Sequence, residues 1–142
     1  MEHRNQWIVL VMVAALPLVG CGQPQKAAQK GHAGSAAVVE ATENPAVKRV
    51  TLSEKAVQRL GIQVADVTTA GQRLEAPYSA LFYDGTGGEW VYVSPQPSVF
   101  VRAGIKVERI EGDTMYLSQG PAAGTKVVVA GAAILYGAEH GL

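Results

Sequence analysis

The chain has 142 residues, and its 12 lysines and arginines balance its 12 aspartates and glutamates, so the formal net charge at pH 7 is zero. Neither a basic stripe nor an acidic block is present, which argues against nucleic-acid binding and against strong attraction to anionic lipid. The length allows one modest hydrophobic core, and the single cysteine excludes an internal disulfide.

The N-terminal segment has the features of an export signal. His3 and Arg4 make the start basic, residues 7–18 are apolar apart from Pro17, and small residues precede Cys21. A membrane-crossing helix needs about 20 apolar residues, so this run is too short to span a bilayer. We therefore predict a cleaved signal peptide at residues 1–20.

Cys21 ends the run Leu18-Val19-Gly20-Cys21. This run resembles the lipobox of bacterial lipoproteins, which implies a diacylglyceryl group on the Cys21 thiol, cleavage before it and acylation of the new amino terminus. Several acyl chains would hold a domain at a membrane durably. The alternatives are an ordinary secretory signal with a chance cysteine, or a buried free thiol.

The segment after Cys21 is predicted to be a flexible tether. Residues 22–45 are mostly Ala, Gly, Gln, Ser and Lys, and they carry too little apolar surface to offset the entropy of ordering. We place the tether at residues 21–46 and expect it to separate the domain from the lipid surface.

One short helix is predicted at residues 53–60. Ser53 is a typical N-cap residue, Glu54 lies in the first turn, and Gly61 follows where a C-terminal cap is expected. The apolar residues Val57 and Leu60 are expected to cover one open end or face of a sheet, because so short a helix needs tertiary packing.

The rest of the domain is predicted to consist of short strands joined by turns. In residues 100–110 the apolar side chains alternate with Arg102, Lys106 and Glu108, which predicts one half-buried strand with these charges in solvent. Glycine-containing turns at 84–88 and 111–113 predict two antiparallel hairpins, and residues 127–129 predict a strand covered on both faces. The predicted strands are 62–67, 78–83, 90–94, 100–110, 114–118 and 126–130.

Together these elements predict an all-β fold, a mainly antiparallel β-roll or small barrel-like sheet with one short helix. The β-rich domain is placed at residues 47–137, and residues 138–142 are predicted to be a tail.

Four segments resemble the periplasmic adaptor subunits, or membrane fusion proteins, of RND-type efflux pumps. They are Arg59-Leu60-Gly61-Ile62-Gln63-Val64, Pro77-Tyr78-Ser79-Ala80-Leu81, Trp90-Val91-Tyr92-Val93 and residues 118–131, and the resemblance covers nearly all of residues 50–136. It implies a membrane-proximal domain and adjoining β-barrel, with an RND-type inner-membrane pump or a full-length adaptor as partner. Many members of the family are lipid-anchored, which agrees with Cys21.

The chain departs from that family in one respect. A full adaptor carries a lipoyl-like domain and a long helical hairpin between its early and late strands, whereas here only residues 68–76 join them. The resemblance therefore implies a reduced or accessory subunit of an efflux system, with heavy-metal efflux among the settings. It leaves open whether the chain forms a homo-oligomer.

The residues offer little for catalysis. The histidines His3, His32 and His140 are too far apart to suggest a metal site, and no nucleophile, base and orienting group can be assembled. We predict no enzyme activity, no cofactor and no dedicated metal site. His32 is more simply a solvated linker residue than a metal ligand, and Met115 is expected in the core.

Trp90, Tyr92 and Phe100 allow two interpretations. They could form an exposed aromatic contact patch, or Trp90 and Tyr92 share one strand face and belong to the core.

The predicted function is a lipid-anchored envelope module on the periplasmic side that acts by protein contact. The alternative is a free-standing lipoprotein that binds a small ligand or metal or has a structural role. Gly22 after the cysteine indicates the outer membrane, whereas the family resemblance indicates the inner membrane. The sequence therefore does not decide which membrane holds the lipid anchor.

Overall fold

Two neighbouring strands, β7 (Glu89–Gln96) and β11 (Lys126–Ala130), carry apolar side chains on both faces. Val91 and Val127 belong to one buried cluster, whereas Tyr92 and Val128 belong to a second cluster on the opposite face. Side chains alternate between the two faces of a strand, so this central sheet must be covered on both sides. The prediction for residues 127–129 is thereby confirmed.

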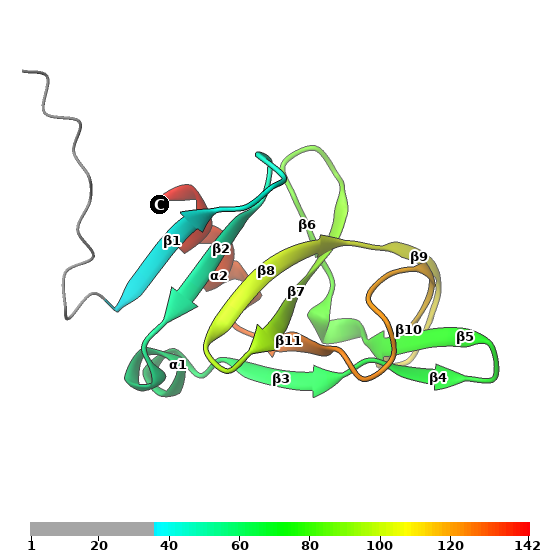
Figure 1. Cartoon of the computed structure of the whole chain (residues 1–142). Helices are drawn as coiled ribbons and strands as arrows, with labels where there is room; N and C mark the ends of the chain where they lie inside the picture. The colour runs from blue at the N-terminus through cyan, green and yellow to red at the C-terminus, as the bar shows by residue number, and fades with distance from the viewer. Residues whose placement is uncertain (1–35) are drawn as a thin grey trace, which may run out of the picture. The chain divides into compact units, whose positions relative to one another are not determined.

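The computed structural model describes residues 36–142 and contains two antiparallel sheets (Figure 1). The larger sheet has the order β1 (Ala37–Ala41), β2 (Lys48–Leu52), β8 (Val99–Gly104), β7, β11 and β3 (Gln63–Asp66), and β6 (Phe82–Tyr83) pairs with the start of β7. The smaller sheet has the order β4 (Thr68–Ala70), β5 (Arg73–Pro77), β10 (Thr114–Gln119) and β9 (Lys106–Glu111).

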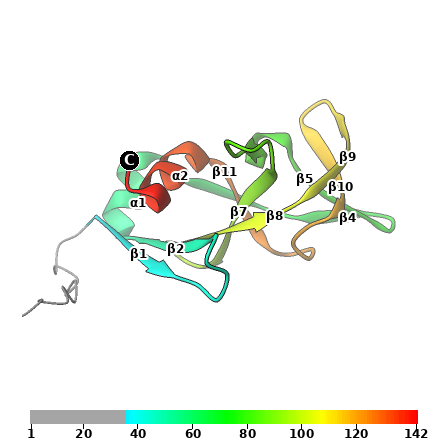
Figure 2. The ribbon, with the colours of Figure 1, turned by 90° about the horizontal axis from the view of Figure 1, so that it is seen from above.

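Three layers result from this arrangement. Helices α1 (Glu54–Leu60) and α2 (Ala132–His140) lie on one side of the larger sheet, as Figure 2 shows. On the other side, residues of the larger sheet pack with Ala76, Met115 and Leu117 of the smaller sheet. The mainly antiparallel β fold is therefore confirmed, as is the burial of Met115. No helix within residues 36–142 is long and apolar enough to cross a membrane.

Helix α1 has the predicted caps. The Ser53 hydroxyl accepts a hydrogen bond from the Ala56 N–H at 3.2 Å, and Gly61 ends the helix with a φ of 65°. A side chain is strained at such a positive φ, which explains glycine at this position. The predicted packing face is partly wrong: Ala56 is the buried residue, Val57 is half-buried, and Leu60 is exposed.

Helix α2 was not predicted from the sequence. It covers most of residues 138–142, which were expected to form a tail, and it buries Leu135 and Glu139 against the larger sheet. Its first turn follows Gly131, which provides no side-chain cap, so the usual start signal is missing from the sequence. The helix is stabilised by packing instead.

The predicted tether extends too far toward the C-terminus. Within it, Ala37–Ala41 form β1, which pairs with β2 in the register Ala37↔Leu52 to Ala41↔Lys48. Most β1 side chains are exposed at the edge of the sheet, so the strand has no pattern of buried residues that would identify it. Residues 1–35, and with them the signal peptide, Cys21 and the rest of the predicted tether, lie outside the described residues.

Two strand predictions need correction. Residues 100–110 form two strands, β8 and β9, which belong to different sheets. The buried Ile105 lies between them, and its N–H donates to the Glu89 carbonyl at 3.0 Å. Residues 78–83 were predicted as one strand, but Tyr78–Ala80 form a 3-10 turn before β6, because the Leu81 N–H bonds back to the Tyr78 carbonyl. Both predicted hairpins are confirmed, at the β6–β7 and β9–β10 connections.

Asp84 organises the β6–β7 turn. Its carboxylate accepts hydrogen bonds from the Thr86 hydroxyl at 2.7 Å, from the Thr86 and Gly88 N–H groups at 2.9 Å, and from the Trp90 indole at 2.8 Å. These bonds, with the Thr86 hydroxyl first, lower the pKa of Asp84 from 3.8 to about 2.

Asp84→Asn should flatten the acid side of the stability profile. Because the pKa of Asp84 is lowered in the folded chain, its ionised carboxylate stabilises the fold above pH 3.8, and this stabilisation is lost as the pH falls toward about 2. Asparagine has no carboxylate and lacks this pH-dependent contribution. Urea unfolding between pH 7 and pH 2 should therefore show a smaller loss of stability in the variant than in the native chain. Asp113→Asn, in the other glycine-containing turn, is the matched control for the loss of one carboxylate. Equal losses in the native chain and Asp84→Asn would contradict the assignment.

Candidate binding site

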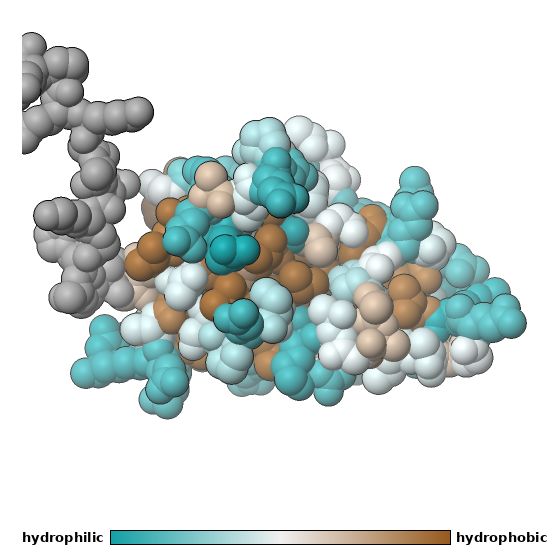
Figure 3. Space-filling view, viewed as in Figure 1, coloured by the Kyte–Doolittle hydropathy of each residue, from teal (hydrophilic) through white to brown (hydrophobic). Residues whose placement is uncertain are grey.

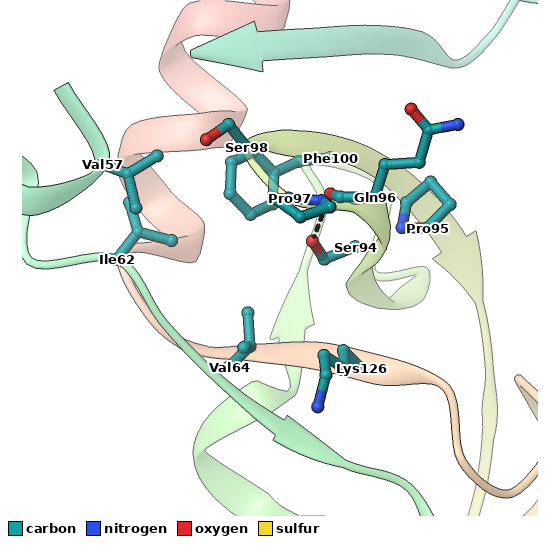
Figure 4. Close-up of a pocket in the computed structure, with 10 residues that line it drawn as sticks. All are labelled: Val57, Ile62, Val64, Ser94, Pro95, Gln96, Pro97, Ser98, Phe100 and Lys126. Carbon is teal, nitrogen blue, oxygen red and sulfur yellow. Dashed lines mark hydrogen bonds between the residues drawn. The ribbon is translucent and has the colours of Figure 1, made fainter. Parts of the chain in front are cut away.

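A cavity within residues 36–142 has a volume of about 410 Å³, which is room for a small ligand. It opens on the helix side of the larger sheet, between α1, β3 and the β7–β8 hairpin (Figure 4). The lining residues are Val57, Ile62, Val64, Ser94, Pro95, Gln96, Pro97, Ser98, Phe100 and Lys126. We call this cavity the β3 pocket.

The apolar part of the β3 pocket comes from three elements. Val57 projects from α1, Ile62 and Val64 come from the entry to β3 and from β3 itself, and Phe100 comes from β8 (Figure 4). Phe100 and Val57 are part of the cluster beneath the helices, so the pocket is an opening into the edge of this core. Figure 3 shows apolar surface between hydrophilic side chains on the face seen in Figure 1.

The opposite wall is the tip of the β7–β8 hairpin. The strand register shifts between Val93 and Gln96, and the Ser94 hydroxyl donates to the Gln96 carbonyl at 3.0 Å. Ser98 then adopts a φ of 64°, and its carbonyl accepts from the Leu52 N–H at 2.9 Å. Two prolines in this tip, Pro95 and Pro97, restrict the backbone further.

Ser98→Gly should stabilise the protein. The Cβ atom of serine is sterically strained at a φ of 64°, and glycine has no Cβ atom. Part of this gain is lost because glycine is more flexible in the unfolded chain, so we expect a net increase of about 0.5 kcal/mol in the free energy of unfolding. Urea titration measures it. Ser79→Gly, at an exposed site without a positive φ, should instead destabilise slightly, and a shift of both variants in one direction would contradict the explanation.

Lys126 is the one charged residue that lines the β3 pocket, and it forms an ion pair with Asp66, which is not a lining residue. The Lys126 ammonium group bonds to Asp66 Oδ1 at 2.8 Å, and in Figure 4 it points away from Val57 and Phe100. The aliphatic part of Lys126 therefore lines the cavity while its charge stays in solvent. The pocket suits an uncharged, apolar group.

A separate group of polar side chains is buried where α2 meets the larger sheet. Glu139 is 2% exposed and Arg102 is 8% exposed. Arg102 Nε lies 3.0 Å from Oε1 and 2.9 Å from Oε2 of Glu139. The Tyr92 hydroxyl donates to Oε2 at 2.5 Å, and the Lys48 N–H donates to Oε1 at 3.1 Å. We call these residues the Glu139 cluster.

The Glu139 cluster is closed and fully bonded. The Arg102 guanidinium lies 4.6 Å from the Trp90 ring centre and 5.6 Å from that of Tyr136, and its Nη2 donates to the Ala46 carbonyl at 2.6 Å. Burial, followed by the hydrogen bond to Glu139, raises the pKa of Tyr92. In the described part of the chain no buried side-chain nitrogen or oxygen lacks a partner. The cluster therefore fastens α2 to the sheet and leaves no group for a ligand.

The structure corrects the predicted aromatic patch. Tyr92 and Phe100 are buried, so they cannot form an exposed contact surface, and the alternative that Tyr92 belongs to the core is confirmed. Trp90 is half-buried, and its indole bonds to Asp84. Only Phe100 reaches the candidate site, as a lining residue of the β3 pocket.

The other predicted positions do not meet in one place. Cys21, His3 and His32 lie outside the described residues, and His140 is an exposed residue at the end of α2 whose Nδ1 lies 2.8 Å from the Tyr136 carbonyl. Within residues 36–142, His, Cys, Asp and Glu form no group of three that could hold a metal ion.

Sequence reasoning missed Arg102 and Glu139. Alternation in residues 100–110 placed Arg102 on the solvent side, where charged strand residues usually lie. Glu139 was assigned to the predicted tail, so no buried acidic partner for Arg102 was expected. One signal was present in the sequence: Arg102 lies on the same strand face as the apolar Phe100. It would have indicated a buried arginine only if α2, which covers this face, had been predicted.

Comparisons with protein-family models, with curated proteins and with solved structures found no match for this chain.

Proposed function

We propose that this chain is a lipid-anchored binding module of the bacterial cell envelope that serves an RND-type efflux system as an adaptor-like or accessory subunit. It acts on the periplasmic side by protein contact, with an inner-membrane pump or a full-length adaptor as partner. The observation that carries the proposal is the β3 pocket, an open apolar site beside an edge strand. Exposed apolar pockets of this kind are typical of interaction sites.

The hairpin between β4 and β5 supports a reduced subunit. Ala70 pairs with Arg73, so the chain turns within two residues at Gly71. This is the segment at which, by the resemblance, a full adaptor would carry its lipoyl-like domain and helical hairpin. A module of this form can contact a pump or an adaptor without reaching an outer-membrane channel.

The described residues favour binding over catalysis. His140 is the one histidine within residues 36–142, and its imidazole contacts Tyr136 rather than a serine or a carboxylate. The buried carboxylate of Glu139 is held by Arg102 and Tyr92. Proton transfer requires an accessible acid or base, and neither group provides one at the β3 pocket.

Cys21→Ser tests the anchor and the partner together. We expect the native chain to fractionate with membranes and to co-purify with a pump or adaptor, whereas the variant loses the acyl chains and with them stable membrane association. Fractionation, intact mass and mass spectrometry of co-purified proteins measure these results. An unmodified, uncleaved N-terminus in the native protein, or a native pull-down without any transport component, would contradict the proposal.

A second candidate rests on the volume of the β3 pocket. A cavity of about 410 Å³ lies within the range of small-molecule sites, roughly 300 to 1,000 Å³, so a free-standing lipoprotein that binds a small apolar ligand is the alternative function. A ligand that raises the melting temperature of the purified chain, in the absence of a partner, would favour this alternative.

A further inference from the structure

The outer edge of β3 has no neighbouring strand within residues 36–142, because β3 is the last strand of the larger sheet. On its inner side, the Val67 N–H donates to the Thr125 carbonyl at 2.8 Å, and the Gly124 N–H donates to the Val67 carbonyl at 2.8 Å. Backbone groups alternate in direction along an antiparallel strand. Val64 and Asp66 therefore direct their N–H and C=O groups toward the free edge.

Val64 links this free edge to the β3 pocket. Its side chain lines the cavity and is 41% exposed. An unpaired backbone edge and an apolar cavity thus meet at one residue. A residue paired with Val64 on an added strand would project its side chain to the same face of the sheet, where the pocket opens.

The charges around the β3 pocket define the chemistry of its occupant. The ion pair between Lys126 and Asp66 leaves no free charge on the lining, and the polar lining residues Ser94, Gln96 and Ser98 are neutral. An ionic group would lose its hydration in the pocket without gaining a counter-ion. An apolar group surrounded by neutral polar atoms matches the arrangement of interface hot spots.

We propose that the partner docks through an extended, uncharged segment that adds a short strand to β3 and places one large apolar side chain in the β3 pocket. This inference rests on the proposed function, because it identifies how the partner of that function is held. A helical segment would not use the free edge, since its own backbone groups are bonded internally. Main-chain bonds to Val64 and Asp66 supply affinity, and the pocket supplies specificity.

Site-specific photo-crosslinking in cells that produce the full chain tests the docking mode. A benzophenone side chain is placed at Gln63 on β3 or at Gln96 on the hairpin tip, and at Gln72 in the β4–β5 turn as the control. We expect Gln63 and Gln96 to crosslink to the same partner peptide, an apolar segment without charges, and Gln72 to give no such product.

Two kinds of variant separate the pocket from the edge. Val64→Asp puts a charge in the pocket at an exposed position, and it should lower the yield of the Gln96 crosslink by at least about tenfold. Asp66→Pro removes a backbone N–H that faces the free edge, whereas Asp66→Ala removes the same ion pair and keeps the N–H. The proline variant should lose the crosslink, and the alanine variant should keep it. Melting curves establish that each variant is folded, and Val64→Asp tests the pocket even if the proline variant is not.

Four results would overturn the inference. If the partner co-purifies but Val64→Asp crosslinks like the native chain, or Asp66→Pro behaves like Asp66→Ala, the docking mode is wrong and the proposed function stands. If native mass spectrometry finds the β3 pocket filled by a small molecule that Val64→Asp displaces while the partner stays bound, the pocket is a ligand site. If no partner is captured from any position and none co-purifies, the proposed function fails and the docking mode with it.

Discussion

Glu139→Ala is expected to lower the free energy of unfolding by about 3 to 5 kcal/mol, because removing one partner of a buried ion pair leaves the other charge uncompensated. Arg102 would remain buried between Trp90 and Tyr136, with the Ala46 carbonyl as its remaining bond. The Tyr92 hydroxyl would also lose its acceptor. Urea unfolding followed by circular dichroism measures the change.

Two further variants make the Glu139 prediction specific. His140→Ala changes the adjacent, exposed residue of α2, and it should alter stability by no more than about 0.5 kcal/mol. Arg102→Met combined with Glu139→Leu should cost less than Glu139→Ala alone, because no unpaired charge stays buried. If Glu139→Ala unfolds at nearly the native urea concentration, the cluster does not fasten α2 to the sheet.

Leu135→Ala is expected to cost about 2 to 5 kcal/mol, the range for deleting a buried leucine side chain and leaving a cavity. Leu135 is completely buried, and its cluster includes Tyr92, Phe100 and Val128 of the larger sheet. It is therefore the main apolar contact of α2 with the sheet. The loss should appear as a lower urea midpoint with an unchanged slope.

The neighbouring residue provides the control for Leu135. Ile134→Ala removes a side chain of similar size that is 43% exposed, and it should cost less than about 1 kcal/mol. Equal losses for Ile134→Ala and Leu135→Ala would contradict the assignment, because burial predicts a larger loss at Leu135 and alanine is the better helix former at both positions.

Features that depend on neighbouring residues were predictable. Helix α1 begins and ends as expected because its N-cap serine and C-terminal glycine act within one turn of the chain. The turns at Asp84 and Gly112 were recognised for the same reason. In β11, a run of valines indicated burial on both faces without any knowledge of which layers cover them.

The candidate site was not predictable in the same way. The β3 pocket joins residues from α1, β3, β8 and the β7–β8 hairpin, which are brought together only when the sheet forms. The aromatic residues singled out from the sequence proved to be mainly core residues, since composition does not reveal which face of a strand meets a helix.

Hydrophobic alternation, helix caps and turn residues act over a few positions, so the mainly antiparallel architecture, the position of α1 and the two glycine-containing hairpins could be predicted from them. The burial of Arg102, the division of residues 100–110 between two sheets and the formation of α2 depend instead on contacts between distant segments. Arg102 and Glu139 are 37 positions apart, and the cost of burying either charge is offset only when the other is in contact.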